Sequence, residues 1–371
     1  MKIRLVVPEV NETATDRPDA CRSCGHWRLH RHGSVEKPIR DHQVSQVRVQ
    51  RYKCAGCGRT FRHYPRGVTA QDQSQRTVVL AAVLYGLGLS CSAGAAFLSA
   101  MGVSIGRMSV WRDARAAGEA LRRRRPTGTV RVLGADETVY RVRGKEVLVG
   151  FAVDDVSGQT LSFDILSGGD AASLWEWLAP CAESMGVEVL VTDGHDPYGV
   201  VASALGLEHQ LCLAHVRKAV ARQTRSLRKQ AADTGSEQTH RQQVDDDVEQ
   251  LRALVSELPE AGLDQLWRMH QRYLGAAPPG KGESASIAYR MRLFTLDLIE
   301  SWPKLGLAQA RPELGMDGTN NATERAIGKS KLRYKTMRGY KSLDGMRNGI
   351  ALTQWLYQGT PELDLARLVA V

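Results

Sequence analysis

From residue 129 onward, short apolar runs alternate with longer amphipathic stretches, which predicts a mixed α/β domain. The run at 130–136 and the run at 187–193 each end in an aspartate, Asp136 and Asp193. The predicted strands cover residues 130–136, 140–143, 147–153, 160–166, 187–193 and 208–213, with a hairpin turn at Gly144. The amphipathic stretches predict helices at residues 170–185 and 198–205.

With 130–136 and 140–143 counted as one strand, this succession of three strands, a helix, a strand, a helix and a strand is that of the ribonuclease H-like fold, in which the first and fourth strands lie side by side. We therefore expect Asp136 and Asp193 to meet at one edge of the domain. Two carboxylates held so close repel each other unless a cation separates them, which is typical of a magnesium site. Each aspartate alone is more often a cap at a strand end, and the pair at matching ends is what favours metal.

A third carboxylate for this site is predicted at Glu324. It lies in the first turns of a helix that follows the cap-like pair Asn320 and Asn321. Behind it runs a basic stretch without an acid until Asp344, a pattern that favours a metal-binding carboxylate whose neighbours hold DNA phosphates. The basic residues predicted to contact DNA here are Lys329, Lys331, Arg333, Lys335 and Arg338. Glu137, Asp196 and Asp317 are rival carboxylates, which we rank as orienting or secondary.

The long segment between Asp193 and Glu324 predicts an all-α insertion at about 216–302. Arg217 and Lys218 open a basic helix at its entrance, which favours DNA contact, although a solvated helix face accounts equally well for either one.

Just before the insertion, Cys212-x2-His215 follows the last predicted strand. Two interpretations of this pair stay open. In the first, Cys212 is buried and His215 is hydrogen-bonded near the active site. In the second, the pair contacts metal or DNA directly.

Helical spacing of apolar residues at 71–87 opens a predicted helix-turn-helix region. A short helix, a turn at Gly102 and a helix begun near Ser104 follow, and this last helix would enter the major groove with Arg107 and Arg112. An arginine run closes the region, either as a phosphate-contacting linker or as a solvated charge run, and the neighbouring helix-turn-helix favours the linker. The run consists of Arg122, Arg123, Arg124 and Arg125.

Four of the seven cysteines form two Cys-x2-Cys pairs, Cys21 with Cys24 and Cys54 with Cys57. Each pair supplies two thiolates from a tight turn, and two such pairs complete a tetrahedral site for one structural Zn²⁺. Redox dithiols are the alternative, which two pairs at this spacing make less favoured. The cysteines therefore predict a zinc ribbon.

The net charge of +10 belongs to the first third of the chain. Residues 1–125 hold 22 Lys and Arg against 9 Asp and Glu, whereas the remainder holds 28 against 31. A basic module points to a polyanion, most commonly nucleic acid, and a merely solubilising surface is the alternative. No apolar run is long enough to span a bilayer and no signal peptide is recognisable, so we expect no membrane partner and a cytoplasmic protein.

The segments around Asp136, Asp193 and Glu324 resemble those of the acidic triad in DDE-type transposases of bacterial insertion sequences. They are Gly-Ala-Asp136-Glu-Thr, Val-Thr-Asp193-Gly and Thr-Asn-Asn-Ala-Thr-Glu324-Arg-Ala-Ile. Any one of the aspartate segments is a weak signal, and the ordered set is a strong one. The resemblance covers nearly the whole chain and implies a multidomain α/β protein. Its domains would be a zinc ribbon at 1–68, a helix-turn-helix domain with a basic linker at 69–126, and a ribonuclease H-like catalytic domain at 127–371 that contains the insertion.

This resemblance implies a DNA transposase that binds the terminal inverted repeats of an insertion sequence and catalyses strand cleavage and strand transfer. The triad would hold two Mg²⁺ ions, for which Mn²⁺ can substitute. The implied partners are double-stranded DNA and further copies of the chain, as a homodimer or a larger assembly. A DNA-binding regulator, or a domesticated transposase without catalysis, is the alternative that an intact triad disfavours. A ribonuclease H-like nuclease for branched DNA is disfavoured by the sequence-reading front end.

Overall fold

The computed structural model describes residues 7–124, 126–233, 238–337 and 339–357. The chain divides into two compact units. The first comprises Met1–Pro126, Tyr140–Val147 and Ile327–Val371, and the second comprises Thr127–Val139 and Leu148–Ala326. Arg125 and Arg338, two of the predicted DNA contacts, lie outside the described residues.

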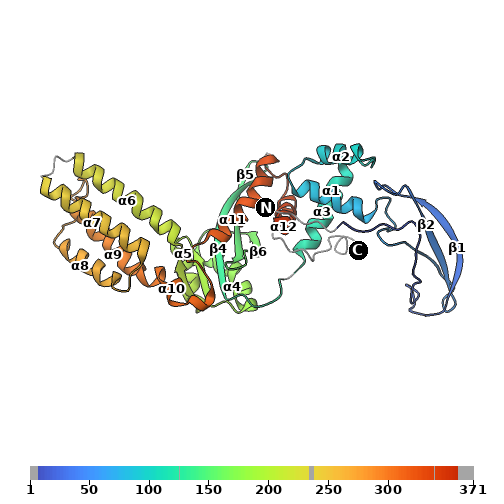
Figure 1. The fold of residues 1–371 in the computed structure, drawn as a ribbon, viewed down its shortest axis with the longest axis horizontal. Helices are drawn as coiled ribbons and strands as arrows, with labels where there is room; N and C mark the ends of the chain where they lie inside the picture. Colours follow the sequence, from blue (N-terminus) through green and yellow to red (C-terminus); the bar gives the residue numbers. More distant parts are fainter. Residues whose placement is uncertain (1–6, 125, 234–237, 338, 358–371) are drawn as a thin grey trace. The chain divides into compact units, whose positions relative to one another are not determined.

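A five-stranded sheet of order β6-β5-β4-β7-β8 forms the centre of the second unit (Figure 1). Its strands are β4 (Val132–Val142), β5 (Lys145–Asp154), β6 (Thr160–Ile165), β7 (Val189–Thr192) and β8 (Glu208–Leu211). β5 and β6 are antiparallel, whereas β4, β7 and β8 run parallel. Helix α4 (Ala171–Met185) joins β6 to β7, and α5 (Asp196–Ala204) joins β7 to β8. The predicted ribonuclease H-like topology is therefore confirmed.

Alternation along the strands sends apolar side chains to both faces of this sheet. Leu133 and Leu190 face α4 and α5, where they join a buried cluster with Leu174. Their neighbours Val132 and Val189 belong instead to a cluster with Leu314 and Met316, which cover the opposite face. Burial on both faces fixes β4 and β7 in place, so the residues at their ends are held on a rigid support.

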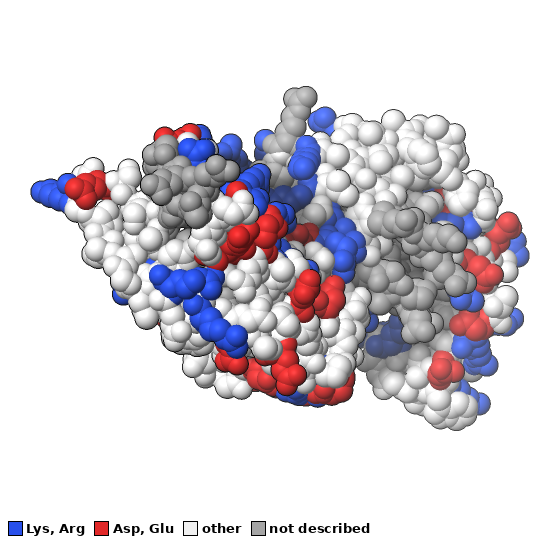
Figure 2. All heavy atoms as spheres, turned by 60° about the vertical axis from the view of Figure 1, so that its left-hand side comes forward, with Lys and Arg blue, Asp and Glu red and all other residues white. Residues whose placement is uncertain are grey.

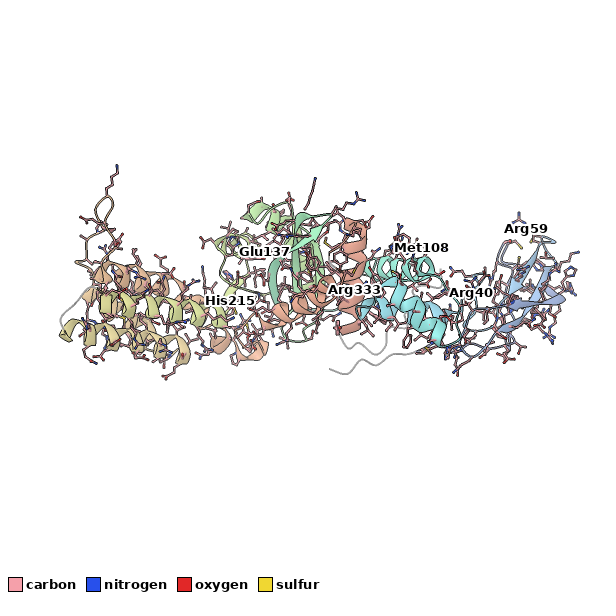
Figure 3. All side chains as sticks on the ribbon, turned by 90° about the horizontal axis from the view of Figure 1, so that it is seen from above. Arg40, Arg59, Met108, Glu137, His215 and Arg333 are labelled. Carbon is pink, nitrogen blue, oxygen red and sulfur yellow. The ribbon has the colours of Figure 1, made fainter. Side chains whose placement is uncertain are left out.

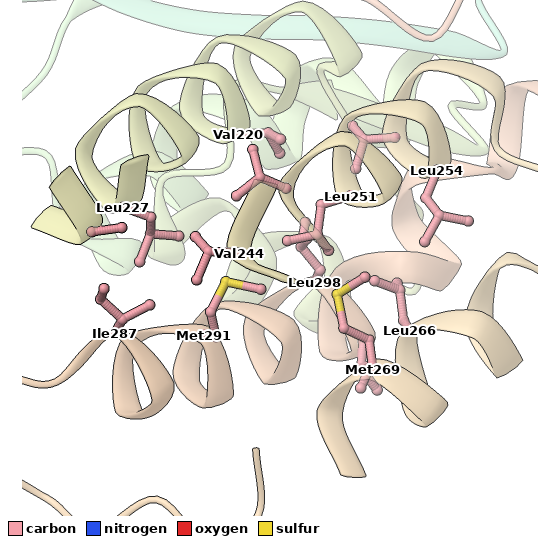
Figure 4. Close-up of a cluster of buried hydrophobic side chains, with 14 residues drawn as sticks. Val220, Leu227, Val244, Leu251, Leu254, Leu266, Met269, Ile287, Met291 and Leu298 are labelled. Carbon is pink, nitrogen blue, oxygen red and sulfur yellow. The ribbon is translucent and has the colours of Figure 1, made fainter. Parts of the chain in front are cut away.

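The segment predicted as a helical insertion forms the four helices α6 (Leu213–Asp233), α7 (Gln238–Glu257), α8 (Gly262–Arg272) and α9 (Ile287–Leu305). They enclose an apolar core of their own, seen in Figure 4. Leu227, Leu251, Leu266 and Met291 are among its most deeply buried members. One acid lies against this core, because Asp247 is only 2% exposed and accepts hydrogen bonds from Arg272 and the hydroxyl of Tyr273.

The first unit begins with an antiparallel sheet of β1 (Leu29–Pro38), β2 (Gln46–Cys54) and β3 (Thr60–His63). Val47 and Val49 are buried on β2, and Tyr52 packs beside Cys21 and Cys54. A buried ion pair lies between this sheet and the first helix. The fully buried carboxylate of Asp41 accepts hydrogen bonds from the guanidinium of Arg76 and from the hydroxyl of Ser74.

Three helices follow in this unit, α1 (Gln75–Gly86), α2 (Cys91–Ala100) and α3 (Arg107–Arg122). The first starts later than the predicted residue 71, because Ser74 is its N-cap and accepts a hydrogen bond from the amide of Thr77. α3 begins at Arg107 rather than near Ser104, since Val103 and Ile105 are buried and hold the turn in the core. Gly102, with φ of 87°, provides the turn as predicted.

The last described helices are α11 (Asn321–Thr336) and α12 (Leu343–Tyr357), preceded by the short α10 (Leu307–Ala310) and a 3-10 turn at Pro312–Leu314. α12 packs on α3 within the first unit. A Cβ at Gly118 of α3 would lie only 2.5 Å from Cβ of Asn348, so the two helices approach closely there. Among the described residues, no helix is long and apolar enough to cross a membrane.

Candidate active site and metal centres

Asp136 and Asp193 stand at matching levels of two neighbouring strands. β4 and β7 pair in parallel register, with Gly134 opposite Val191. Two residues further along each chain come Asp136, still within β4, and Asp193, directly after β7 ends at Thr192. The parallel pairing of β4 with β7, the first and fourth strands of the prediction, therefore places both aspartates at the level where β7 ends.

The pKa of Asp136 reflects its burial and the acidic residues around it. Burial, the negative charge of Asp193 and the charges of Glu137 and Glu324 raise the pKa of Asp136 to about 7, against a hydrogen bond from the amide of Glu137 that lowers it. Burial is the first cause of this raised pKa, and the negative charges of the neighbouring carboxylates add to it. A divalent cation would relieve both the repulsion and the burial penalty, and carboxylate oxygens are the ligands that Mg²⁺ prefers.

Glu324 lies in the first turn of α11, where its amide donates to the carbonyl of Asn320. Its carboxylate oxygen Oε1 is 3.6 Å from Nε2 of His215. Donor atoms of Glu324, Cys212 and His215 all lie within 4.8 Å of one another. Among the described residues, the carboxylate oxygens of Asp136, Asp193 and Glu324 do not all lie within 4.8 Å of one another. The negative charges of Asp193 and Glu324 nevertheless act on Asp136.

The Cys212 side chain is fully buried, and His215 lies at the start of α6, as Figure 3 shows. Cys212 Sγ accepts a hydrogen bond of 3.2 Å from the amide of Asn320, and the Cys212 amide donates to the carbonyl of Thr192. Nδ1 of His215 is buried without a hydrogen-bond partner in the part of the chain that the structure describes. Cys212 thus joins the end of β7 to the start of α11.

Glu137, the neighbour of Asp136, has partners of its own. The hydroxyl of Tyr198 donates a hydrogen bond to Glu137 Oε2, and His195 Nδ1 lies 3.6 Å from Glu137 Oε1. Both partners come from the segment that follows β7. Sequence reasoning missed Tyr198 and His195, which only the fold brings to Glu137.

The four paired cysteines form a second candidate metal centre. Their sulfur atoms all lie within 4.8 Å of one another, with 3.8 Å between Cys21 and Cys57 and 3.6 Å between Cys24 and Cys54. Zn–S bonds of about 2.3 Å in a tetrahedron place sulfurs roughly 3.8 Å apart, which these separations match. Backbone hydrogen bonds, first from the amide of Ser23, lower the pKa of Cys21, whereas the neighbouring sulfurs raise the pKa of Cys24, so without metal Cys21 is the more readily ionised of these two thiols.

The predicted DNA-contacting residues differ in their hydrogen bonds. Most of them are exposed, namely Arg107, Arg112, Arg122, Arg123, Arg124, Arg217, Lys218 and Lys335. Of these, Arg122 donates to the side chain of Asn348 and Arg217 to backbone carbonyls at the end of α7. The half-buried Lys329 donates to the carbonyl of Tyr357. On the face drawn in Figure 2, basic and acidic side chains lie next to one another over much of the surface.

Arg333 corrects the expectation of a DNA contact. It is 2% exposed, its guanidinium lies 3.8 Å from the centre of the Tyr85 ring, and it donates to the carbonyl of Leu89. Its charge therefore stabilises the packing of α11 against α1 in the first unit. Lys331 is partly buried over the ring of Tyr140, with 4.5 Å between Nζ and the ring centre.

Comparison with known proteins identifies the family. The model described as Transposase IS66 family matches residues 85–348, which is well over half of the chain. The chain belongs to this family, and it is a DNA transposase. No curated protein is significantly similar in sequence.

Among solved structures, the chain is similar to the catalytic core domain of BIV integrase, at 11% identity and a TM-score of 0.19, over 45% of this chain and 82% of that one. It is also similar to the HTLV-2 integrase catalytic core domain in complex with magnesium, at 13% identity and a TM-score of 0.21, over 36% and 90% of the two chains. The strand order described above, and not these likenesses, defines the fold.

Proposed function

We propose that the second unit cleaves DNA at the ends of an insertion sequence and joins those ends to target DNA, with Asp136, Asp193 and Glu324 as its catalytic carboxylates. The β4–β7 register carries the proposal, because it brings Asp136 and Asp193 to one edge of the sheet. The raised pKa of Asp136, caused first by burial and then by its acidic neighbours, supports it. A DNA-binding regulator has no use for such a costly group of acids.

The donor set suits Mg²⁺, with Mn²⁺ as substitute, since all three proposed ligands are carboxylates. When bound, two such ions supply Lewis acids for the attacking and leaving oxygens of an in-line displacement. Asp136 lies within the rigid strand β4, and Asp193 directly follows the end of β7. Glu324 enters from α11, where Cys212 and Asn320 fix the start of the helix. In this arrangement we assign positioning roles to Cys212 and His215, and an orienting role to Glu137.

We assign roles to the other regions of the chain from their cysteines, their charge and the exposure of their basic side chains. We propose that residues 1–68 bind one structural Zn²⁺ and, with the helix-turn-helix region at 69–126, recognise the terminal inverted repeats. The exposed Arg107 and Arg112 on α3 would contact the major groove, and residues 127–371 would form the catalytic domain with its helical insertion. Joining two ends calls for a homodimer or a larger assembly on DNA, in the bacterial cytoplasm.

The test uses an end-labelled DNA fragment that flanks the gene, incubated with the zinc-loaded protein and Mg²⁺. Wild type should cut at a defined repeat boundary, Asp193→Asn should bind the same fragment without cutting, and Asp164→Asn, an exposed acid on β6, should behave as wild type. Cleavage by Asp193→Asn at the wild-type rate would overturn the assignment. Specific binding without cleavage by any of the three would favour the regulator.

A further inference from the structure

Three oxygen atoms without hydrogen-bond partners converge on Gly134 of β4. They are Oγ1 of Thr323, Oδ1 of Asn320 and Oδ1 of Asp155, and each is buried without a partner among the described residues. A Cβ added at Gly134 would lie 2.5 Å from the threonine oxygen, 2.9 Å from the asparagine oxygen and 3.4 Å from the aspartate oxygen. Only glycine fits here, because the three oxygens approach residue 134 so closely that any side chain would collide with at least two of them.

The surrounding structure holds these oxygens in place. The Asn320 side-chain nitrogen donates to the carbonyl of Ala135 at 2.8 Å, which sets the orientation of the amide and leaves its oxygen facing Gly134. The Asp155 amide donates to the carbonyl of Val132 at 3.1 Å. Thr323 lies in the first turn of α11, and both Thr323 and Asn320 are fully buried. The oxygens therefore come from the end of β5 and the start of α11, and the backbone around them holds them in place.

This arrangement is costly without a guest. An unsatisfied buried acceptor costs about 1 to 3 kcal/mol, and of the three oxygens only that of the threonine hydroxyl, or that of Asp155 when it is protonated, carries a proton to share. The local charge is also negative, because Asp154 and Asp317 act on Asp155 against the single opposing charge of Arg325. A bound cation would accept electron pairs from all three oxygens and would also offset the negative charge around Asp155. Carboxylate, amide and hydroxyl oxygens are the ligands of hard divalent cations.

We propose that these three oxygens form a cation site, distinct from the carboxylates of Asp136, Asp193 and Glu324, which binds one Mg²⁺ or Ca²⁺ through Asp155, Asn320 and Thr323. Its position gives it a role. The oxygens lie next to Gly134, two residues before Asp136, and Thr323 directly precedes Glu324. A cation here would join the end of β5 to the start of the helix that carries Glu324, beside the strand that carries Asp136, and only this role rests on the proposed function.

The test removes the proposed catalytic site first. In zinc-loaded full-length protein with Asp136→Asn and Asp193→Asn, equilibrium dialysis against Mn²⁺ should still find one ion bound per chain, and Mg²⁺ or Ca²⁺ should displace it. Adding Asp155→Asn should abolish this binding, and adding Thr323→Val, which keeps the shape and removes the hydroxyl, should weaken it at least tenfold. Adding Asp164→Asn is the matched control and should leave it unchanged. Unaltered thermal unfolding of each variant in metal-free buffer shows that the fold is kept.

Two results would overturn the proposal: no Mn²⁺ bound in the double variant, or binding that Asp155→Asn leaves unchanged. In the first case water or a protonated Asp155 satisfies the oxygens. Displacement by K⁺ at equal concentration would also contradict a divalent site. The two proposals fail separately, because cleavage of DNA by Asp193→Asn would overturn the proposed function while Mn²⁺ binding that depends on Asp155 would survive it.

Discussion

Asp136 lies level with Asp193 across two parallel strands, two residues beyond the paired Gly134 and Val191. The relationship depends on both strands being buried on both faces, because a slip of one residue would send one carboxylate to the opposite side of the sheet. Such a pair is expensive for the metal-free protein. Proteins commonly retain costly groups of this kind where activity requires them.

We therefore expect Asp136→Asn to stabilise the metal-free second unit. Burial and the neighbouring acids raise the pKa of Asp136 to about 7, so the ionised form is disfavoured in the folded state. An acid whose pKa is raised on folding costs stability as the pH rises from its ordinary value through the folded one, and this cost is absent at lower pH. The variant should gain about 4 kcal/mol at pH 8 and almost nothing at pH 3.5.

Hydrogen exchange of the β4 and β7 amides in Mg²⁺-free buffer measures this gain, with Asp164→Asn as the control. Adding Mg²⁺ should slow exchange in wild type more than in the variant. A variant less stable than wild type at pH 8 would contradict the electrostatic account.

The Asp41–Arg76 pair should show the opposite dependence on pH. Burial opposes ionisation of Asp41, but hydrogen bonds from Arg76, Ser74 and the amide of Gln43 outweigh it and lower the pKa of Asp41 to about 2. The stability it contributes is present above its ordinary pKa near 4 and is lost as the pH falls toward 2. Asp41→Asn should cost about 3 to 5 kcal/mol at pH 7, because Arg76 would keep a buried charge without a counter-ion.

Hydrogen exchange at the amides of Val79 and Val83 in α1, measured as the temperature is raised, reports this loss of stability. Glu36→Gln provides the control, since the Glu36–Arg48 pair is exposed and should contribute less than about 1 kcal/mol. Equal effects of the two substitutions would refute the distinction between buried and exposed pairs.

The zinc ribbon should depend on its metal for folding. Cys54→Ser should lower the zinc content from one ion per chain to nearly none and expose β1 to β3 to proteolysis, because Cys54 and Tyr52 share a small core that the metal completes. Cys181→Ser, a change outside the cluster, should keep its zinc. Zinc measured by atomic absorption on the purified chains decides the matter, and a full complement in Cys54→Ser would exclude a four-thiolate site.

Strand alternation and the aspartates at two strand ends were enough to predict the ribonuclease H-like order and the level of Asp136 with Asp193. Patterns of this kind can be predicted because they depend on residues that are close together in the sequence. The packing of α12 on α3 at Gly118 and Asn348 was not predictable, because it depends on helices more than two hundred residues apart. Arg333 was misjudged for the same reason, since its place in a basic run gave no sign of Tyr85.

The candidate site was predictable in part. The three carboxylates could be named from their segments, and a buried Cys212 with His215 near the active site was one of the two interpretations left open. Which carboxylate the pair approaches could not be predicted, because only the fold brings Cys212 and His215 beside Glu324. The group at Gly134 left one overlooked signal. A glycine within a buried strand indicates a close approach by another group, which here is the helix start at Asn320 and Thr323.

Arg107 and Arg112 should contribute to DNA binding through charge, base contact or both, and salt separates these contributions. Both are exposed on α3, and Arg112 donates only to the carbonyl of Met108 in its own helix. If both arginines contact phosphates, replacing both with alanine should reduce the slope of log affinity against log salt by about 2. If they read base edges instead, the slope should change little while discrimination between the transposon end and random DNA falls by about 1 to 3 kcal/mol per contact.

Fluorescence anisotropy with both DNAs at several salt concentrations gives the salt slope and the discrimination between the two DNAs. Arg252→Ala, on α7 and paired with Glu249, is the control for lost positive charge elsewhere. If the double alanine variant matched that control on both DNAs, α3 would not be the recognition helix.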